Sequence, residues 1–225
     1  YIQTLKTQGE NQGGLHVRGE FEFDVESDAL DLSLINKELL QYLPIKSVSE
    51  LDLKGLFCTD FHRTEIQLEN IEVVFDQGKV SFQELNDDIC EIELELKNQT
   101  MPVKDAVAEL FDLAFEISKH ISVMPSDVSK ALRGERLKKI SNNEAYIIKA
   151  PELSSKNNQK NVVNCMEYIQ TNWEAYCFSH QESYLLDAIL FIDKLIQILE
   201  KTDLVGFVAK IAQIKIQWSS LVGDN

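Results

Sequence analysis

The segment Glu91–Glu95 reads Glu-Ile-Glu-Leu-Glu, and this alternation constrains the fold more than any other feature of the sequence. Successive side chains of a β-strand point to opposite faces, so an extended strand gathers the three carboxylates on one face. The apolar residues Ile89, Ile92, Leu94 and Leu96 are expected to back this row. The sequence therefore predicts a β-strand that presents a row of carboxylates.

The acidic row has two interpretations. Same-face residues of a strand lie roughly 6.6–7 Å apart, and carboxylate oxygens in such a row suit Mg²⁺ or Mn²⁺, which also bind substrate phosphates. The alternative is an ordinary amphipathic strand with its charged face in water. Neighbouring predicted strands also carry charges on one face, namely the cations Lys6, Arg18 and Arg63 and the acids Glu20, Glu72 and Asp76. If the sheet curls with these faces inward, a polyanion with a metal ion satisfies both signs of charge.

The charge is unevenly distributed along the chain. The net charge is −15; residues 1–100 hold 8 Lys/Arg against 21 Asp/Glu, whereas the remaining 125 residues hold 14 against 16. An acidic half repels a phosphodiester backbone, so we expect no nucleic-acid partner, while a small polyphosphate that arrives with metal ions stays compatible. The sequence contains no stretch of 18 or more apolar residues, so no membrane span is expected. The four cysteines lack C-x-x-C spacing, which favours reduced thiols and a cytoplasmic location.

The periodicity changes near the middle of the chain and predicts an α+β fold. Strands are expected first, and the pattern places them at 2–7, 15–25, 55–68, 70–76, 79–84 and 89–97. Asp76-Gln77-Gly78 is expected to be a tight turn between two of them. Helices are expected afterwards, at about 102–117, 125–138, 162–179, 182–201 and 203–222. Because Tyr1 already lies within an expected strand, we expect the native start to lie upstream.

Five sequence blocks occur in an order typical of one family. They are Gly13–Glu20, Phe57–Arg63, Asp76–Gly78, Ile89–Leu96 and Ser129–Gly134. Together they resemble the CYTH or triphosphate tunnel metalloenzyme family, and most closely the bacterial inorganic triphosphatases that carry a CHAD-type helical region. The resemblance implies three parts: an N-terminally truncated CYTH-like tunnel domain at 1–140, a linker at 141–161, and a helical region at 162–225, which would match a partial CHAD-type region.

The resemblance also implies a fold and a reaction. The fold would be an eight-stranded antiparallel β-tunnel that binds triphosphate or polyphosphate with Mg²⁺ or Mn²⁺. The reaction would be hydrolysis of inorganic triphosphate to diphosphate and phosphate, by attack of a metal-positioned water. The implied phosphate-binding residues are Lys6, Arg18, Arg63, Lys130 and Arg133. The implied metal ligands are Glu91, Glu93 and Glu95, with Glu72 and Asp76, and Glu20 would line the tunnel near the attacking water.

The sequence departs from the family pattern at its start. The family's N-terminal E-x-E-x-K strand and the arginine-rich strand before Lys6 do not occur, and we expect both upstream of Tyr1. Four alternatives stay open: thiamine-triphosphate hydrolysis, cyclisation of ATP as in class IV adenylyl cyclases, a non-catalytic polyphosphate-binding or scaffold module, and a structural domain with solvated charged faces. The trailing helices would either bind polyphosphate or only pack, and the sequence leaves the oligomeric state open.

Overall fold

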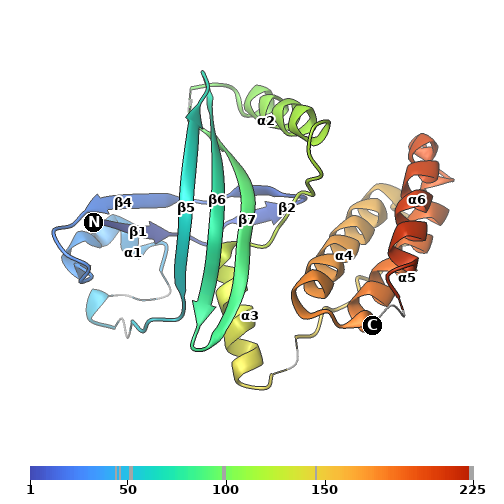
Figure 1. Ribbon diagram of the computed structural model, residues 1–225. Helices are drawn as coiled ribbons and strands as arrows, with labels where there is room; N and C mark the ends of the chain where they lie inside the picture. Colours follow the sequence, from blue (N-terminus) through green and yellow to red (C-terminus); the bar gives the residue numbers. More distant parts are fainter. Residues whose placement is uncertain (44, 46, 51–52, 98–99, 145, 223–225) are drawn as a thin grey trace. The chain divides into compact units, whose positions relative to one another are not determined.

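The computed structural model describes residues 1–43, 45, 47–50, 53–97, 100–144 and 146–222 (Figure 1). Ala145, within the predicted linker, lies outside these residues. The chain forms two compact units, Tyr1–Leu56 and Phe57–Asn225. The predicted α+β class is confirmed, with antiparallel strands first and a helical region last.

The described residues of the unit Tyr1–Leu56 form two antiparallel strand pairs and three short helical segments. Strand β1 (Ile2–Lys6) pairs with β4 (Glu20–Asp24), and β2 (Glu10–Gln12) pairs with β3 (Leu15–Val17). The remaining elements are η1 (Leu32–Leu34), α1 (Lys37–Leu40) and η2 (Val48–Glu50).

The prediction of one strand over 15–25 was wrong. Gly13 and Gly14 both adopt positive φ and form a hairpin, so β3 folds back on β2. The chain then changes partner, and β4 pairs with β1. The interruption is closed by Thr7, whose backbone N–H donates to the Gly19 carbonyl at 2.9 Å and whose hydroxyl accepts from the Gly19 N–H at 2.9 Å.

The unit Phe57–Asn225 begins with an antiparallel sheet in the order β5-β6-β7. Its strands are β5 (Cys58–Gln67), β6 (Ile71–Phe82) and β7 (Leu85–Leu96). In the register, Arg63 lies opposite Asp76, and Asp76 lies opposite Glu91. Three predicted site residues therefore form one row across the sheet.

The predicted turn at Asp76-Gln77-Gly78 was wrong, because β6 continues through these residues. The chain turns later, at Gln83, which has φ of 53°. Gly78 is needed for another reason: a Cβ there would lie 2.2 Å from the Asp60 carbonyl oxygen and 2.4 Å from the Phe61 Cα. The glycine thus permits close approach of β5, and Asp76 lies inside the central strand.

Helix α3 (Lys130–Ser141) packs on one face of this sheet, against β6 and β7 (Figure 1). Leu137 of the helix packs against Val80 of β6 and Ile89 of β7, and all three side chains are buried. Ile89 was expected behind the glutamate row, but it shares parity with Glu91 and lies on the same face. The helix starts at Lys130 rather than near residue 125, because the Ser129 side chain accepts from the Leu132 N–H and caps it there.

The other helices follow the sequence pattern closely. Helix α2 spans Val103–Ser118, α4 spans Asn158–Ser179, α5 spans Glu182–Leu199, η3 spans Val205–Phe207, and α6 spans Val208–Ser219. Helices α4 and α5 share a buried core that includes Tyr168 and Phe191. Helix α4 begins within the predicted linker, while the domain boundaries themselves stay predictions. Among the described residues, none of the helices has the length and apolar character that a membrane span requires.

Candidate functional site

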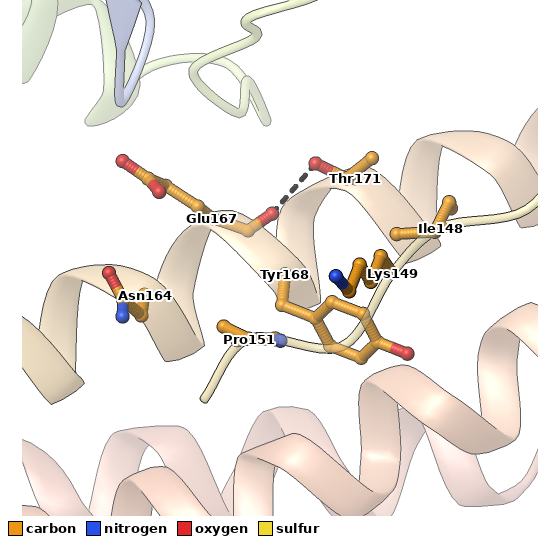
Figure 2. A pocket seen from close by; sticks show the side chains of 7 residues that line it. All are labelled: Ile148, Lys149, Pro151, Asn164, Glu167, Tyr168 and Thr171. Carbon is orange, nitrogen blue, oxygen red and sulfur yellow. Dashed lines mark hydrogen bonds between the residues drawn. The ribbon is translucent and has the colours of Figure 1, made fainter. Parts of the chain in front are cut away.

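A shallow pocket lies in the helical region, beside α4 (Figure 2). Lys149 and Tyr168 line it, together with Thr171, whose hydroxyl donates to the Glu167 carbonyl of its own helix at 2.8 Å. This hydrogen bond lies within one helix. The charged groups named by the sequence analysis gather elsewhere.

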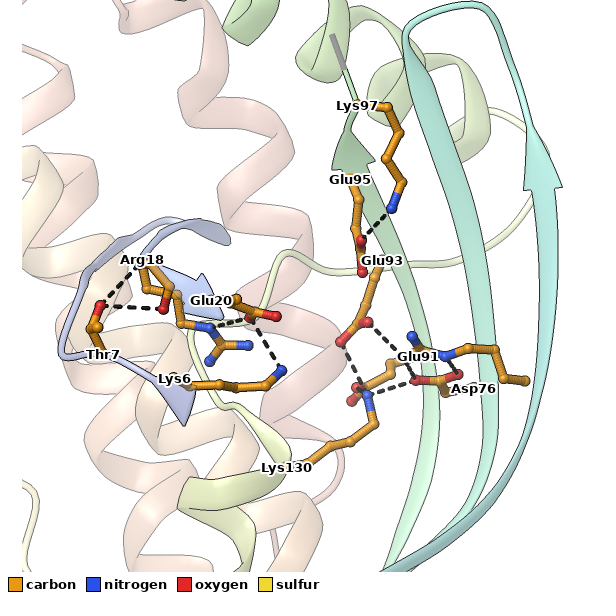
Figure 3. Close-up of polar contacts among 12 residues, drawn as sticks. Lys6, Thr7, Arg18, Glu20, Asp76, Glu91, Glu93, Glu95, Lys97 and Lys130 are labelled. Carbon is orange, nitrogen blue, oxygen red and sulfur yellow. Dashed lines mark hydrogen bonds and ion pairs between the residues drawn. The ribbon is translucent and has the colours of Figure 1, made fainter. Parts of the chain in front are cut away.

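Five predicted residues meet on the sheet face against which α3 packs, and we call Arg63, Asp76, Glu91, Glu93 and Lys130 the central cluster. Figure 3 labels the last four of them. Lys130 Nζ lies 2.6 Å from Asp76 Oδ2 and 3.0 Å from Glu93 Oε1, and it also contacts Glu91 Oε1. Arg63 donates to both Asp76 oxygens, from Nε at 2.8 Å and from Nη2 at 2.7 Å. The same Nη2 lies 3.1 Å from Glu93 Oε2.

Each member of the central cluster is positioned by a regular element. Arg63, Asp76 and Glu91 come from directly paired positions of β5, β6 and β7, and Glu93 follows Glu91 on the same face of β7. Lys130 is the first residue of α3, whose position on the sheet is set by the buried Leu137 two turns later. Strand register and helix packing together bring residues from four elements to one place.

The central cluster is partly removed from water. The Asp76 side chain is fully buried and that of Lys130 is 16% exposed. Burial by itself raises the pKa of Asp76, but hydrogen bonds from Arg63 and Lys130 outweigh it and leave this pKa below its ordinary value. Burial opposes the charge on Lys130 too, yet the bonds to Asp76 and Glu91 raise its pKa above the ordinary value. Both groups are therefore held in their charged forms.

Phe61 forms an aromatic contact under both cations. Its ring centroid lies 5.1 Å from Lys130 Nζ and 5.5 Å from Arg63 Cζ, distances at which a ring face attracts a cation. Phe61 was not among the site residues predicted from the sequence. It shares strand parity with Arg63, and this signal could have placed it on the charged face.

Three carboxylates of the central cluster have an arrangement that can hold a metal ion. Asp76, Glu91 and Glu93 each offer one oxygen, and these atoms lie within 4.8 Å of one another. An all-oxygen, carboxylate-rich donor set is typical of hard divalent cations such as Mg²⁺ and Mn²⁺. The residues present therefore fit such an ion.

Two of the predicted metal ligands lie in a second group. Glu72 and Glu95 face each other across β6 and β7, and Lys97 bridges them at 2.5 Å and 3.1 Å. The hydrogen bond that the Lys97 ammonium donates to the Glu72 carboxylate raises the pKa of Lys97. The five carboxylates predicted as metal ligands are thus divided between two clusters. Lys97 was not among the predicted site residues, although it is the next residue after the glutamate row on the same strand face.

Arg133 lies one turn after Lys130 and contacts both the sheet and the edge of the central cluster. Its Nη1 donates to the Asp88 carbonyl at 3.1 Å and lies 3.4 Å from Asp87 Oδ2. Its Nη2 lies 3.5 Å from Glu91 Oε2. Burial raises the pKa of Asp87. These contacts tie α3 to the start of β7.

The other three predicted residues meet within the unit Tyr1–Leu56. Lys6 Nζ lies 3.1 Å and Arg18 Nε 2.8 Å from the same Glu20 oxygen, Oε1. Burial by itself raises the pKa of Glu20, but the hydrogen bonds from Arg18 and Lys6 hold it below its ordinary value. Arg18 was expected within a strand, and it lies instead in the link between β3 and β4.

Comparisons with known proteins identify the family of the chain. The CYTH domain family model matches residues 1–134. An inorganic triphosphatase of Haemophilus influenzae is 36% identical over 136 residues, which cover 58% of this chain and 36% of that relative. The match thus spans about a third of the relative's length. Helices α4, α5 and α6 lie after the residues that the family model matches.

Proposed function

The chain belongs to the CYTH domain family, and on that premise we propose that it acts as a metal-dependent inorganic triphosphatase. The substrate would be inorganic triphosphate, and the products diphosphate and phosphate. The observation that carries the proposal is the central cluster, in which two cations and three carboxylates from four elements share one partly buried place. The similarity to a protein named inorganic triphosphatase supports the choice of substrate.

We assign the phosphate-binding role to the cations of the central cluster. Arg63 presents a planar fork of donors, which suits two phosphate oxygens at once, and Lys130 presents a compact charge from the helix side. Asp76 would keep the Arg63 fork oriented through its two hydrogen bonds. Arg133 would support Lys130 by tying α3 to β7. By the family resemblance, Lys6 and Arg18 would bind further phosphate oxygens, with Glu20 between them.

Asp76, Glu91 and Glu93 are our proposed ligands for Mg²⁺ or Mn²⁺. Such an ion would neutralise phosphate charge and orient the attacking water, so the reaction needs no protein nucleophile. The residues of the chain would bind and align the triphosphate. Their positive charges would lie opposite the phosphate oxygens on which negative charge develops. The closed tunnel, the CHAD-type character of the last helices and a cytoplasmic location stay predictions.

The proposal is tested by phosphate release from tripolyphosphate, measured with Mg²⁺, with Mn²⁺ and with a chelator. We expect release with at least one of the two metals and none with the chelator. Glu93→Gln keeps the shape of a proposed metal ligand but removes its charge, and it should lower kcat/KM by about a hundredfold. Glu116→Gln is the matched control, because Glu116 pairs with Lys119 on the surface of α2 and should leave the rate unchanged.

Two results would contradict the proposal. One is the absence of phosphate release with both metals, and calorimetric binding of tripolyphosphate without release would then favour the binding-module alternative. The other is an unchanged rate in Glu93→Gln, which would favour a solvated acidic face. Thiamine triphosphate and ATP, assayed in parallel, separate the remaining alternatives by their relative kcat/KM.

A further inference from the structure

Every carboxylate of the proposed metal site already has a cationic partner within this chain. Asp76 binds Arg63 and Lys130, and Glu93 binds the same two cations. Glu91 contacts Lys130 and, at 3.5 Å, Arg133. The ligands are therefore ion-paired when no metal or phosphate is bound.

Lys130 has a special place among these cations, because its ammonium group contacts all three carboxylates at once. The three carboxylate oxygens lie within 4.8 Å of one another, and Lys130 Nζ bonds to one oxygen of each residue. A cation that contacts all three carboxylates at this range lies where a metal ion with the same ligands would lie. The ammonium and a divalent ion would compete for one position.

The local charges point the same way. Asp76, Glu91 and Glu93 carry three negative charges. Arg63 and Lys130 offset two of them, and Arg133 also contacts Glu91. A divalent ion added beside a retained ammonium would leave the group with excess positive charge in a partly buried place, where repulsion is weakly screened. Bound triphosphate adds negative charge, which offsets the positive charges of both the metal ion and the displaced Lys130 ammonium.

We propose that Lys130 is the resident counter-ion of the carboxylates Asp76, Glu91 and Glu93, and that it moves from them to the phosphate when triphosphate binds. This rests on the proposed function for the identity of the anion. Metal and triphosphate then bind with positive coupling, since each favours the arrangement in which Lys130 has left the carboxylates. In the absence of triphosphate, Lys130 competes with the metal and lowers its affinity.

The surroundings of Lys130 allow this exchange without refolding. The four-carbon stem is flexible, while the start of the helix is held by the Ser129 cap and by the buried Leu137. The Phe61 ring centroid lies 5.1 Å from the Lys130 ammonium, and a ring face at this distance attracts a cation beside the central cluster. Arg63 keeps both bonds to the buried Asp76 after Lys130 leaves, so this carboxylate still has a cationic partner.

The test measures Mn²⁺ binding by calorimetry at pH 8 with no phosphate present. Lys130→Met and Lys130→Gln remove the charge, and we expect each to bind Mn²⁺ at least about tenfold more tightly than the wild type. The glutamine variant keeps N–H donors for the carboxylates and covers the case in which the methionine variant does not fold. Lys130→Arg keeps the charge and should show wild-type affinity. Lys215→Met is the matched control, because Lys215 pairs with Asp193 at 2.6 Å, outside the central cluster.

Tripolyphosphate binding, measured with a chelator in place of metal, should change in the opposite direction. We expect the two neutral variants to bind it at least about tenfold more weakly and Lys215→Met to bind it as the wild type does. A merely structural lysine would instead weaken both affinities together. Unchanged or weaker Mn²⁺ binding in both neutral variants overturns the inference, whatever the wild-type activity. Tighter Mn²⁺ binding in a protein that neither binds nor hydrolyses tripolyphosphate supports the counter-ion role and overturns the proposed function alone.

Discussion

Asp76→Ala is the substitution whose effect on stability follows most directly from the geometry. Asp76 is fully buried and accepts three charge-assisted contacts, two from Arg63 and one from Lys130. Breaking a buried ion pair typically costs about 3–5 kcal/mol. Both cations keep Glu93 as a partner, and the Arg63 side chain is 35% exposed, so we lower the expected loss to about 2–4 kcal/mol.

The assay is urea unfolding at pH 7, followed by far-UV circular dichroism, with Asp193→Ala as the control. Asp193 pairs with Lys215 while both side chains are more than a third exposed, so its loss should cost about 0–1 kcal/mol. A loss in Asp76→Ala no larger than in the control would refute the view that these contacts stabilise the fold.

The difference in stability between the wild type and Asp76→Ala should depend on pH in a defined direction. The pKa of Asp76 is lowered in the folded state, so its contribution to stability is present above the ordinary carboxyl value, about 3.9. This contribution is lost as pH falls below that value and through the lowered folded pKa. The difference between wild type and Asp76→Ala should therefore be constant from pH 7 to about pH 5 and shrink at lower pH. A difference that grows on acidification would show that the sign is wrong.

Three further substitutions test the surroundings of the central cluster. Gly78→Ala should destabilise the protein by about 1–3 kcal/mol, seen as a lower Tm, because the new Cβ overlaps the Asp60 carbonyl oxygen at 2.2 Å. Leu137→Ala should cost about 2–5 kcal/mol in urea unfolding, and a loss below 1 kcal/mol would deny that this side chain anchors α3. Phe61→Leu should raise KM for tripolyphosphate several-fold, whereas Phe61→Tyr retains the ring face and should keep the wild-type KM; equal effects of the two would exclude an aromatic role.

Features that depend on neighbouring residues could be predicted from the sequence. The alternation at Glu91–Glu95 identified a strand and its acidic face, and the 3.6-residue period identified the helices, because both signals come from the local direction of side chains. All five residues of the central cluster were also named in advance. Strand parity and the family resemblance were sufficient to select them.

Long-range pairing produced the differences from the sequence analysis. Asp76-Gln77-Gly78 has the composition of a turn, but pairing on both sides keeps it extended, and the glycine serves the close approach of β5. Residues 15–25 alternate as one strand, yet two different partners divide them. In both places, contacts with distant strands outweighed the local pattern.

The division of the carboxylates also required the tertiary structure. Sequence parity puts Glu91, Glu93 and Glu95 on one face, whereas the register of β6 against β7 pairs Glu91 with Asp76 and Glu95 with Glu72. Register depends on pairing along the whole strand, so no local pattern separates these two groups.

The residue types of the site and the strand faces that carry them thus follow from local alternation along the chain. The meeting of Lys130 with Asp76, Glu91 and Glu93 follows instead from the packing of Leu137 against Val80 and Ile89. Lys130 is 37 residues beyond Glu93 in sequence. The physical reason is that a contact across such a separation depends on how α3 docks on the sheet, which alternation and periodicity do not specify.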